Sequence, residues 1–563
     1  MTSLVIAEKP SVASDIAKAL GGFQQRDGFW ERDDIIISSA VGHLVEIVAN
    51  EGENRPRGFA GLPVIPDPFG LEVIAGRESA FRTLQKLLRR QDVDMVYNAC
   101  DAGREGELIF RLIIEKAGCT HLPTRRMWMQ SMTKEALRDA YAVAMPGSEK
   151  DNLYRAARCR SEGDWLVGIN GSRAMSEIFK AMSGRHESSS TGRVQTPTLA
   201  ILVDREMAIK NFVPENYWEI HGAFATGAES YKGRWKGEAN APVEGQSEEE
   251  ADAASSRFFD QARAREVLQR IDGQPVTLVE ETTKPQASAP PSLFDLTTLQ
   301  REANKIFKMS AKKTLEIAQS LYERHKVTTY PRTNSKHLPE DYIPTVNSVM
   351  NDLQGSPWGQ HVKTIIDSDW VQPNKRIFDN AKIEDHFAII PTGLLSDQLD
   401  QDERRIYELI VRRFIAAFFP SAEFDITKRI TYIGSDAFYS SGKVMVAAGW
   451  MAVLGAFDED GNRIGAGDKV LSAIAEGETP TVQAMELVSG VTKPPSRYSE
   501  AKLLGVMETA GKLVEDEELR AAMKDLGLGT PATRANIIET LKDDGTQHKP
   551  PKPKEPYARL IEN

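Results

Sequence analysis

The stretch Leu4-Val5-Ile6-Ala7-Glu8-Lys9-Pro10-Ser11 stands near the start of the chain. Its four apolar residues predict a short buried strand. A helix should follow, with Ser11 as its cap, because apolar residues recur at helical spacing at Val12, Ile16, Ala19 and Leu20. Glu8 and Lys9 would then lie at the C-terminal edge of a strand, where open α/β sheets place their ligands.

The same pattern returns with more acidic residues. A second strand, 35–39, leads into Gly42-His43-Leu44, and residues 94–100 predict a third. Asp101-Ala102-Gly103-Arg104-Glu105-Gly106-Glu107 follows, then a helix to about Lys116 with Gly118 as its stop. Carboxylates at a strand-to-helix turn can bind a hard cation through oxygen. They also simply favour the positive end of a helix, and the residues alone leave both interpretations open.

A third stretch, Lys326-Val327-Thr328-Thr329-Tyr330-Pro331-Arg332-Thr333-Asn334-Ser335, carries candidate chemistry. The β-branched residues and the proline predict an extended segment, which places Tyr330 and Arg332 on one face. A guanidinium beside a phenol favours the phenolate and can neutralise a phosphate oxygen. The pair therefore suits covalent attack on a phosphodiester, although an ordinary tyrosine in a turn would give the same letters.

Composition limits the classes of protein. A chain of 563 residues is expected to form several domains, and contents of 41% hydrophobic and 27% charged residues are typical of globular proteins. No apolar run is long enough to span a bilayer, and the N-terminus lacks a signal-peptide pattern. The three cysteines form no CxxC pair, so neither a zinc ribbon nor a disulfide framework is predicted. The net charge of −11 argues against an overall basic surface but not against a local basic channel.

Residues 188–197 form a hydroxyl-rich turn before an expected helix. Backbone N–H groups at such a turn, together with Arg193, are suited to a phosphate. A polar loop with a capping residue is the alternative. The preceding segment, about 158–173, has helical periodicity, and its polar residues could equally form a solvated face.

Several motifs occur along the chain in the order that is typical of one protein family. Residues 7–11 paired with 101–107 resemble a toprim domain, the magnesium-binding module of topoisomerases, bacterial primases and some nucleases, although Gly103 stands where the usual pattern has a second aspartate. Gly192-Arg193-Val194-Gln195-Thr196-Pro197 resembles a motif of type IA DNA topoisomerases. Further matches follow in the expected order at 290–294, 298–300, 330–332, 385–392 and 527–535. From about Leu4 to Leu541 the chain is similar to this family, most of all to its bacterial topoisomerase III branch.

The resemblance implies a multidomain fold, with a toprim α/β domain, α-helical and β-rich parts in a four-domain type IA topoisomerase torus. The expected toprim domain covers 1–152 and a helical DNA-binding domain combines 153–215 with 485–563. A β-rich arch combines 216–288 with 402–484, and a lid covers 289–401. We expect a solvated insertion at 244–254 and a disordered tail at 549–554. The family core normally continues further, so the chain is expected to be shortened.

The resemblance also assigns residues. It implies that Tyr330 is the nucleophile, that Arg332 and Lys9 stabilise charge on the phosphorus, that Glu8 protonates the departing oxygen and that His386 positions the phosphate. The implied magnesium ligands are Glu8, Asp101 and Glu105. The implied DNA-binding residues are His43, Arg160, Asp164, Arg173, Ser190, Thr191, Gly192, Arg193, Val194, Gln195, Thr530 and Arg534.

The expected activity is magnesium-dependent cleavage and religation of single-stranded DNA through a 5′-phosphotyrosyl intermediate, which relaxes negative supercoils and decatenates DNA. Neither zinc nor ATP is expected, and no GxxxxGK[ST] phosphate loop occurs. We expect a cytoplasmic, nucleoid-associated monomer without membrane contact, acting on single-stranded and negatively supercoiled DNA with a helicase or single-strand-binding protein as partner. A toprim primase or nuclease, or a toprim single-stranded DNA-binding protein with impaired catalysis, remains the alternative.

Overall fold

The computed structural model describes residues 2–49, 58–184, 189–227, 229–237, 255–455, 470–471, 474–475, 477–513, 527–542 and 561–562. The insertion and the tail expected at 244–254 and 549–554 lie outside these ranges. Among the helices in the described ranges, none combines the length and the apolar character that a membrane crossing requires.

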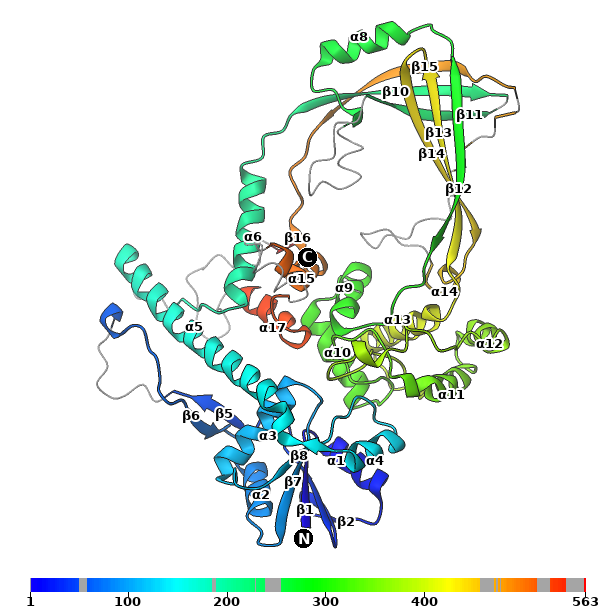
Figure 1. The fold of residues 1–563 in the computed structure, drawn as a ribbon. Helices are drawn as coiled ribbons and strands as arrows, with labels where there is room; N and C mark the ends of the chain where they lie inside the picture. The colour runs from blue at the N-terminus through cyan, green and yellow to red at the C-terminus, as the bar shows by residue number, and fades with distance from the viewer. Residues whose placement is uncertain are drawn as a thin grey trace.

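A seven-stranded sheet forms the centre of the N-terminal α/β unit (Figure 1). Its central strand β1 pairs in parallel with β4 on one side and β7 on the other, which confirms the strands predicted from residues 4–7, 35–39 and 94–100. In sheet order the strands are β2 (Gln24–Arg26), β3 (Phe29–Arg32), β4 (Ile35–Ser39), β1 (Thr2–Ala7), β7 (Val93–Ala99), β8 (Thr124–Arg126) and β9 (Met145–Pro146).

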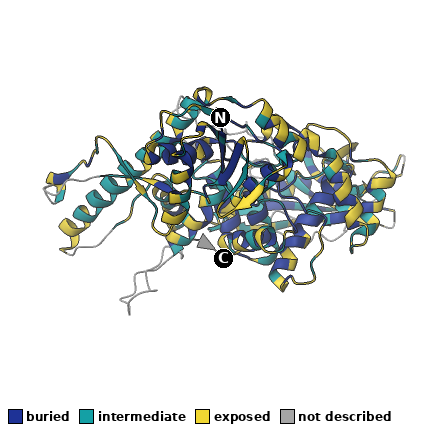
Figure 2. Ribbon diagram, turned by 90° about the horizontal axis from the view of Figure 1, so that it is seen from below, coloured by how far each residue is buried: buried dark blue, intermediate teal, exposed yellow. Residues whose placement is uncertain are grey.

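Helices cover both faces of this sheet. Alternate side chains of β1 therefore point into two different hydrophobic cores, one on each face. Leu4 and Ile6 belong to one buried cluster, whereas Val5 and Ala7 belong to another. Figure 2 shows buried strands beside the N-terminus. The covering elements are α1 (Pro10–Leu20), α2 (Glu78–Leu88), α3 (Arg104–Ala117), α4 (Lys134–Ala142) and the hairpin of β5 (Val45–Val48) and β6 (Gly70–Val73).

The ends of α1 and α3 test two sequence predictions. The predicted Ser11 cap is wrong: α1 begins one residue earlier, at Pro10, with Lys9 preceding it and no side-chain cap. Proline is well suited to the first helical position because its fixed φ matches the helix and its missing N–H would be unpaired there. Gly118 does end α3, with a left-handed φ of 74°.

A long helix, α5 (Asp151–Ser183), leaves the α/β unit and leads to a small helical group. This group is formed by α6 (Gln195–Lys210), α15 (Glu500–Glu508) and α17 (Pro531–Lys542), with the short strands β16 (Tyr498–Ser499) and β17 (Ile561–Glu562). Leu202, Leu503, Leu504 and Ile538 share its buried core. Segments about 300 residues apart in sequence therefore pack as one group.

A six-stranded antiparallel sheet forms the far side of the molecule. Helix α8 (Gln261–Ile271) packs on it, within residues 216–288, for which a β-rich arch was expected. Val267 and Ile271 of α8 share a core with Phe224 of the sheet, so tertiary burial stabilises this helix. In sheet order the strands are β12 (Leu278–Ser288), β13 (Ala422–Ile433), β14 (Asp436–Ala447), β11 (Glu229–Lys236), β10 (Asn216–Thr226) and β15 (Thr481–Val491).

A second helical unit completes the structure, and we call it the tyrosine unit because it carries Tyr330. One extended core holds it together. It contains α9 (Leu296–Phe307), α10 (Ala311–Glu323), α11 (Ile343–Leu353), α12 (Gly359–Asp367), α13 (Gln401–Ala417) and α14 (Met451–Leu454). Short 3-10 turns are Glu340–Tyr342 and Asn380–Lys382 in this unit, and Gly58–Gly61, Gly147–Lys150 and Ala510–Leu513 elsewhere.

The parts are arranged as a ring (Figure 1). From α6 the chain rises along β10 to the six-stranded sheet, returns along β12 to the tyrosine unit, and closes against the small helical group through contacts of α15 with α9. The α/β unit lies directly below the tyrosine unit. Hydrogen bonds join the two, from Ser131 and Thr133 to Asp341 at 2.8 and 3.2 Å.

Candidate active site

The Tyr330 loop is fixed to the segment that carries His386. Thr329 donates its N–H to the Ile390 carbonyl at 2.9 Å and its hydroxyl to the Ala388 carbonyl at 3.0 Å. Thr333 donates its hydroxyl to the carbonyl of His386 at 2.8 Å. These bonds, which satisfy the backbone of an otherwise irregular loop, explain why Tyr330 and His386 lie with ring centroids 4.4 Å apart.

The C-terminal ends of β1 and β7 meet this loop from below. Lys9 Nζ lies 4.0 Å from the centroid of the Tyr330 ring and donates to Asp101 Oδ2 at 2.8 Å. His386 Nε2 lies 3.1 Å from the same Asp101 oxygen. Glu8 is next to the group, with Oε2 accepting from the Asp101 N–H at 3.4 Å and Oε1 at 3.9 Å from Lys9 Nζ. Five residues from four segments of the chain thus form one cluster, which we call the Tyr330 cluster.

The two carboxyl groups of the cluster, Glu8 and Asp101, have pKa values that are shifted in opposite directions. Burial raises the pKa of Glu8 from 4.5 to about 8, and repulsion by Asp101 adds to that effect. Burial would also raise the pKa of Asp101, but the hydrogen bond from His386 and the charge of Lys9 hold it well below its usual range. At neutral pH Asp101 therefore carries the negative charge and Glu8 keeps its proton.

The phenol of Tyr330 corrects a sequence-based expectation. Lys9 and Arg332 do lower its pKa, but burial raises it further, and the net shift is upward. The phenolate is therefore not favoured in this closed arrangement without substrate. Arg332 lies beside α10, where the Gln319 amide oxygen accepts from its Nη2 at 3.0 Å and its Nε at 3.2 Å when that oxygen faces the guanidinium.

The Tyr330 cluster offers few protein ligands for a magnesium ion. Among the described residues, no group of three or more His, Cys, Asp or Glu side chains is arranged to hold a metal ion. The carboxylates of Glu8 and Asp101 are neighbours, and Mg²⁺ accepts one or two carboxylates with waters and a phosphate. Glu105, the third expected ligand, instead lies 3.7 Å from His43 Nε2 and 3.9 Å from Arg160 Nη1. Glu8 and Asp101 are therefore the neighbouring candidate ligands for a cation, whereas Glu105 lies beside basic groups.

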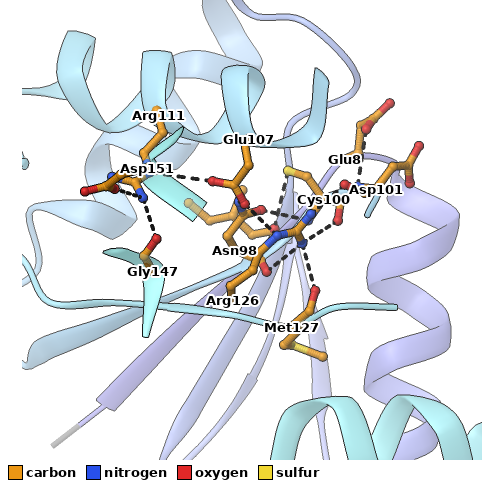
Figure 3. A network of polar contacts seen from close by, with 11 residues as sticks. Glu8, Asn98, Cys100, Asp101, Glu107, Arg111, Arg126, Met127, Gly147 and Asp151 are labelled. Carbon is orange, nitrogen blue, oxygen red and sulfur yellow. Dashed lines mark hydrogen bonds and ion pairs between the residues drawn. The ribbon is translucent and has the colours of Figure 1, made fainter. Parts of the chain in front are cut away.

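A buried ion pair beneath Asp101 was not found by sequence reasoning (Figure 3). Arg126 is fully buried, and its Nε lies 2.6 Å from Glu107 Oε1. Its other nitrogens donate to the carbonyls of Asn98, Cys100, Met127 and Asp101 at 2.6–3.1 Å. Arg126 therefore fixes the turn that presents the Asp101 carboxylate, and the acidic motif gives no signal for it because Arg126 lies on another strand, β8.

The predicted phosphate-binding turn lies at the start of α6, facing α5. Arg193 Nε pairs with Asp164 Oδ1 at 3.1 Å, and its Nη1 lies 3.5 Å from the Arg160 carbonyl. The side chain of Gln195 donates to the Ser190 carbonyl and hydroxyl at 3.0 and 2.9 Å. The N–H groups of Thr191 and Gly192 bond to hydroxyls of Ser172 and Thr196, and Val194 packs against the helical core. Arg173 lies further along α5 and is partly buried.

The two predicted DNA contacts before and within α17 differ from each other. Thr530 is partly exposed and forms a hydroxyl pair with Thr533 at 3.1 Å. Arg534 is 5% exposed, and protein oxygens of Thr297, Leu528 and Gly529 occupy its guanidinium at 3.0–3.1 Å. This guanidinium is satisfied within the protein and ties α17 to α9 through Thr297, and a phosphate contact by Arg534 stays a prediction.

Sequence profiles of two known families match the chain. The family described as DNA topoisomerase matches residues 148–554, and the family described as Toprim domain matches residues 3–131. Together they cover most of the chain in the order predicted from its motifs.

Individual relatives agree with the profiles. The chain is 39% identical over 548 residues to DNA topoisomerase 3 of Bacillus licheniformis and 38% identical to that of Bacillus subtilis, covering 96% of this chain and 72% of each relative. The solved structure of full-length topoisomerase I from Thermotoga maritima is similar, with a TM-score of 0.58 and 21% identity over 96% of this chain and 78% of that chain. That likeness confirms the predicted fold class.

Proposed function

This chain belongs to the type IA DNA topoisomerase family and is an isomerase of DNA, and from that premise we propose that Tyr330 is its nucleophile. The Tyr330 oxygen attacks a phosphate of single-stranded DNA, the bond from phosphorus to the 3′ oxygen breaks, and a 5′-phosphotyrosyl enzyme results. The observation that supports this assignment is the approach of Lys9, at 4.0 Å from the ring centroid, and His386, at 4.4 Å, to the Tyr330 ring.

The neighbours of Tyr330 have separate roles in this proposal. Lys9 and Arg332 stabilise the charge that develops on the phosphoryl oxygens, because both are fixed cations near the phenol. When DNA binds, its scissile phosphate would lie beside these two cations and would be the group that Tyr330 attacks. His386, held by Asp101, positions that phosphate. Asp101 acts through Lys9 and His386 by fixing both.

Glu8 is the proposed proton carrier. Its raised pKa keeps it protonated at neutral pH, so it has a proton for the departing 3′ oxygen, while the phenolic proton of Tyr330 is released to water. In religation the 3′ hydroxyl attacks the phosphotyrosine, Glu8 takes the hydroxyl proton, the bond from phosphorus to the Tyr330 oxygen breaks, and that oxygen regains a proton from water. One phosphodiester replaces another of similar energy, so the proposal needs no ATP.

Magnesium would be held by Asp101 and, once Glu8 has given up its proton, by Glu8 as well, together with a DNA phosphate, and when bound it would neutralise backbone charge near the break. The residues of the chain then keep the 3′ end in place while the tyrosine unit moves away from the α/β unit and another strand passes. On this basis we propose relaxation of negative supercoils and decatenation as the products. No zinc is part of the proposal.

The proposed domain division, DNA path and partners also follow from membership of the family. We propose that the four-domain division 1–152, 153–215 with 485–563, 216–288 with 402–484, and 289–401 applies, the tyrosine unit being the core of the lid. Single-stranded DNA would run past α5 and the 190–195 turn, where Arg160, Arg173 and Arg193 lie. We further propose that the protein acts as a nucleoid-associated monomer together with a helicase or single-strand-binding protein.

One variant tests the central assignment. Tyr330→Phe removes the nucleophilic oxygen and leaves the ring packing, so we expect no covalent protein–DNA adduct after a denaturant stop and nearly unchanged single-strand binding. Tyr322→Phe, which changes the neighbouring ring at 5.4 Å, is the matched control and should keep the adduct. An adduct that persists in Tyr330→Phe would contradict the assignment, and cutting without any adduct in the parent would favour a toprim nuclease.

A further inference from the structure

The α/β unit and the tyrosine unit also touch outside the Tyr330 cluster, through one carboxylate. Asp341 Oδ2 accepts from the Ser131 hydroxyl at 2.8 Å and from the Thr133 hydroxyl at 3.2 Å. A further bond joins the two units nearby in sequence, from the Gln130 amide to the carbonyl of Ile383 at 2.5 Å. We call the two hydroxyl bonds to the carboxylate the closing contact, because they exist only while the units are together.

The two hydroxyls of the closing contact are oriented as donors by their own unit. Ser131 Oγ accepts from the Thr133 N–H at 3.4 Å, and Thr133 Oγ1 accepts from the Ala136 N–H at 3.3 Å at the start of α4. The segment itself is fixed, because Met129 just before it is buried in the core of the α/β unit. A hydroxyl whose oxygen already accepts a bond has its proton free for another group. A carboxylate oxygen has lone pairs for both protons, so it fits this pair of donors.

On the other side, Asp341 is connected to the active site by packing. It lies in the 3-10 turn Glu340–Tyr342, where the ring of the buried Tyr342 lies with its centroid 4.8 Å from that of Phe387. Phe387 directly follows His386, a member of the Tyr330 cluster. One packed body therefore carries both the closing contact and the catalytic side chains of the tyrosine unit.

The closing contact is weak enough to break and reform in each cycle. Asp341 is exposed, so water can replace both hydroxyls when the units separate. In the part of the chain that the structure describes, no cation forms an ion pair with this carboxylate, so separation leaves no charge without its partner. Hydrogen bonds of this kind still favour the closed position by about 2- to 10-fold.

We propose that Asp341 is a positioning residue for religation, which returns the tyrosine unit to the α/β unit by accepting from Ser131 and Thr133. The inference rests on the proposed function, in which Tyr330 carries the 5′ end while the α/β unit keeps the 3′ end. Religation requires the 3′ hydroxyl to meet the phosphotyrosine, so it occurs in the closed position. Asp341 forms no bond within the Tyr330 cluster and acts through closure.

Asp341→Ala in the full-length chain tests the proposal by separating religation from cleavage. Loss of the closing contact favours the open position of the cleaved complex, so the religation rate should fall about 2- to 10-fold and the equilibrium fraction of covalent adduct should rise by a similar factor. The cleavage rate should keep its parental value, because an uncut strand bound to both units holds them together. Denaturant-stopped time courses with a labelled single-stranded oligonucleotide give both rates, religation being followed after salt is raised to prevent rebinding.

Three further variants distinguish the closing contact from general damage. Asp341→Asn keeps an oxygen that can accept from the hydroxyls, so it should restore religation toward the parental rate. Ser131→Ala should slow religation when Asp341 is present and have no further effect in Asp341→Ala, because both changes remove the same bond. Glu340→Ala removes the adjacent exposed acid, which pairs with Lys375 inside the tyrosine unit, and should keep the parental rate.

Each outcome supports or overturns the proposal. Parental religation in Asp341→Ala would overturn it, as would equal losses in Asp341→Ala and Glu340→Ala, or fully additive losses in Ser131→Ala and Asp341→Ala. Melting temperatures show whether each variant folds, and if Asp341→Ala did not, parental religation in Ser131→Ala would overturn the proposal by itself. Failure of the proposed function is seen separately, as a parent without adduct or an adduct that survives in Tyr330→Phe.

Discussion

Two charged clusters lie on either side of the β7–α3 turn, and they differ in burial and in origin. The Arg126–Glu107 pair is fully buried, belongs to the α/β unit alone, and has backbone carbonyls around its guanidinium. The Tyr330 cluster is partly exposed and combines β1 and β7 with a loop more than 200 residues later. The buried pair is closed off from solvent, whereas the partly exposed side chains of the Tyr330 cluster can be reached by a substrate.

Because of this difference in burial, we expect the buried pair to contribute to folding stability and the Tyr330 cluster to contribute to the reaction. Breaking a buried pair leaves an uncompensated charge in a low-dielectric interior, so its cost appears in folding stability. Changing a partly exposed group leaves water as a substitute partner, so its cost appears in the reaction.

Arg126→Ala should lower the free energy of unfolding by about 3–5 kcal/mol, because Glu107 is left buried without its partner. The measurement is denaturant unfolding of the full-length chain. Arg125→Ala, which changes the adjacent exposed arginine with its single bond to the Ala144 carbonyl, should cost less than about 1 kcal/mol. Equal effects of the two variants would contradict the comparison.

Lys9→Met should show the opposite pattern. Removing a fixed cation beside the phosphorus should reduce the cleavage rate about 10²–10³-fold. Stability should change by less than about 1 kcal/mol, because Lys9 is partly exposed and His386 still pairs with Asp101. Single-turnover cleavage and denaturant unfolding of the same sample check both statements, and a large stability loss with parental cleavage would refute them.

Glu8 gives the Tyr330 cluster a pH signature. Its pKa is about 8 in the folded protein and 4.5 as the ordinary value, so the folded state holds more protons between these limits. Stability in EDTA should therefore fall as pH rises from about 4.5 to 8. In Glu8→Gln this part of the pH dependence should be absent. Melting temperature against pH checks the sign, and identical profiles for parent and variant would contradict the assigned proton.

The smallest effect should come from the DNA track. Arg193→Ala removes one proposed phosphate contact, so the slope of log affinity for single-stranded DNA against log salt should decrease by about 1. Arg265→Ala on the exposed surface of α8, distant from α5 in Figure 1, is the control and should keep the parental slope. An unchanged slope in Arg193→Ala would remove it from the track and leave it as the partner of Asp164.

Much of the local structure was predictable because its causes are local. The strand at 35–39 has the predicted bounds, and the helix that follows Asp101 ends at the predicted Gly118, since apolar spacing and terminating residues operate within a few positions. Helix α8 was missed because it depends on burial against a sheet whose strands come from distant parts of the chain.

The sequence by itself determined the motifs, their order and hence the family, because a motif consists of residue types at short spacings and both can be read directly from the sequence. The tertiary structure decided the net protonation of Glu8 and Tyr330, the burial of Arg126 and Arg534, and the contact between the α/β and tyrosine units at Asp341. Each of these depends on which groups from distant segments come within a few ångströms of one another, and on how much water remains between them. Distance and solvent exclusion set electrostatic energies, and neither is encoded in local sequence patterns.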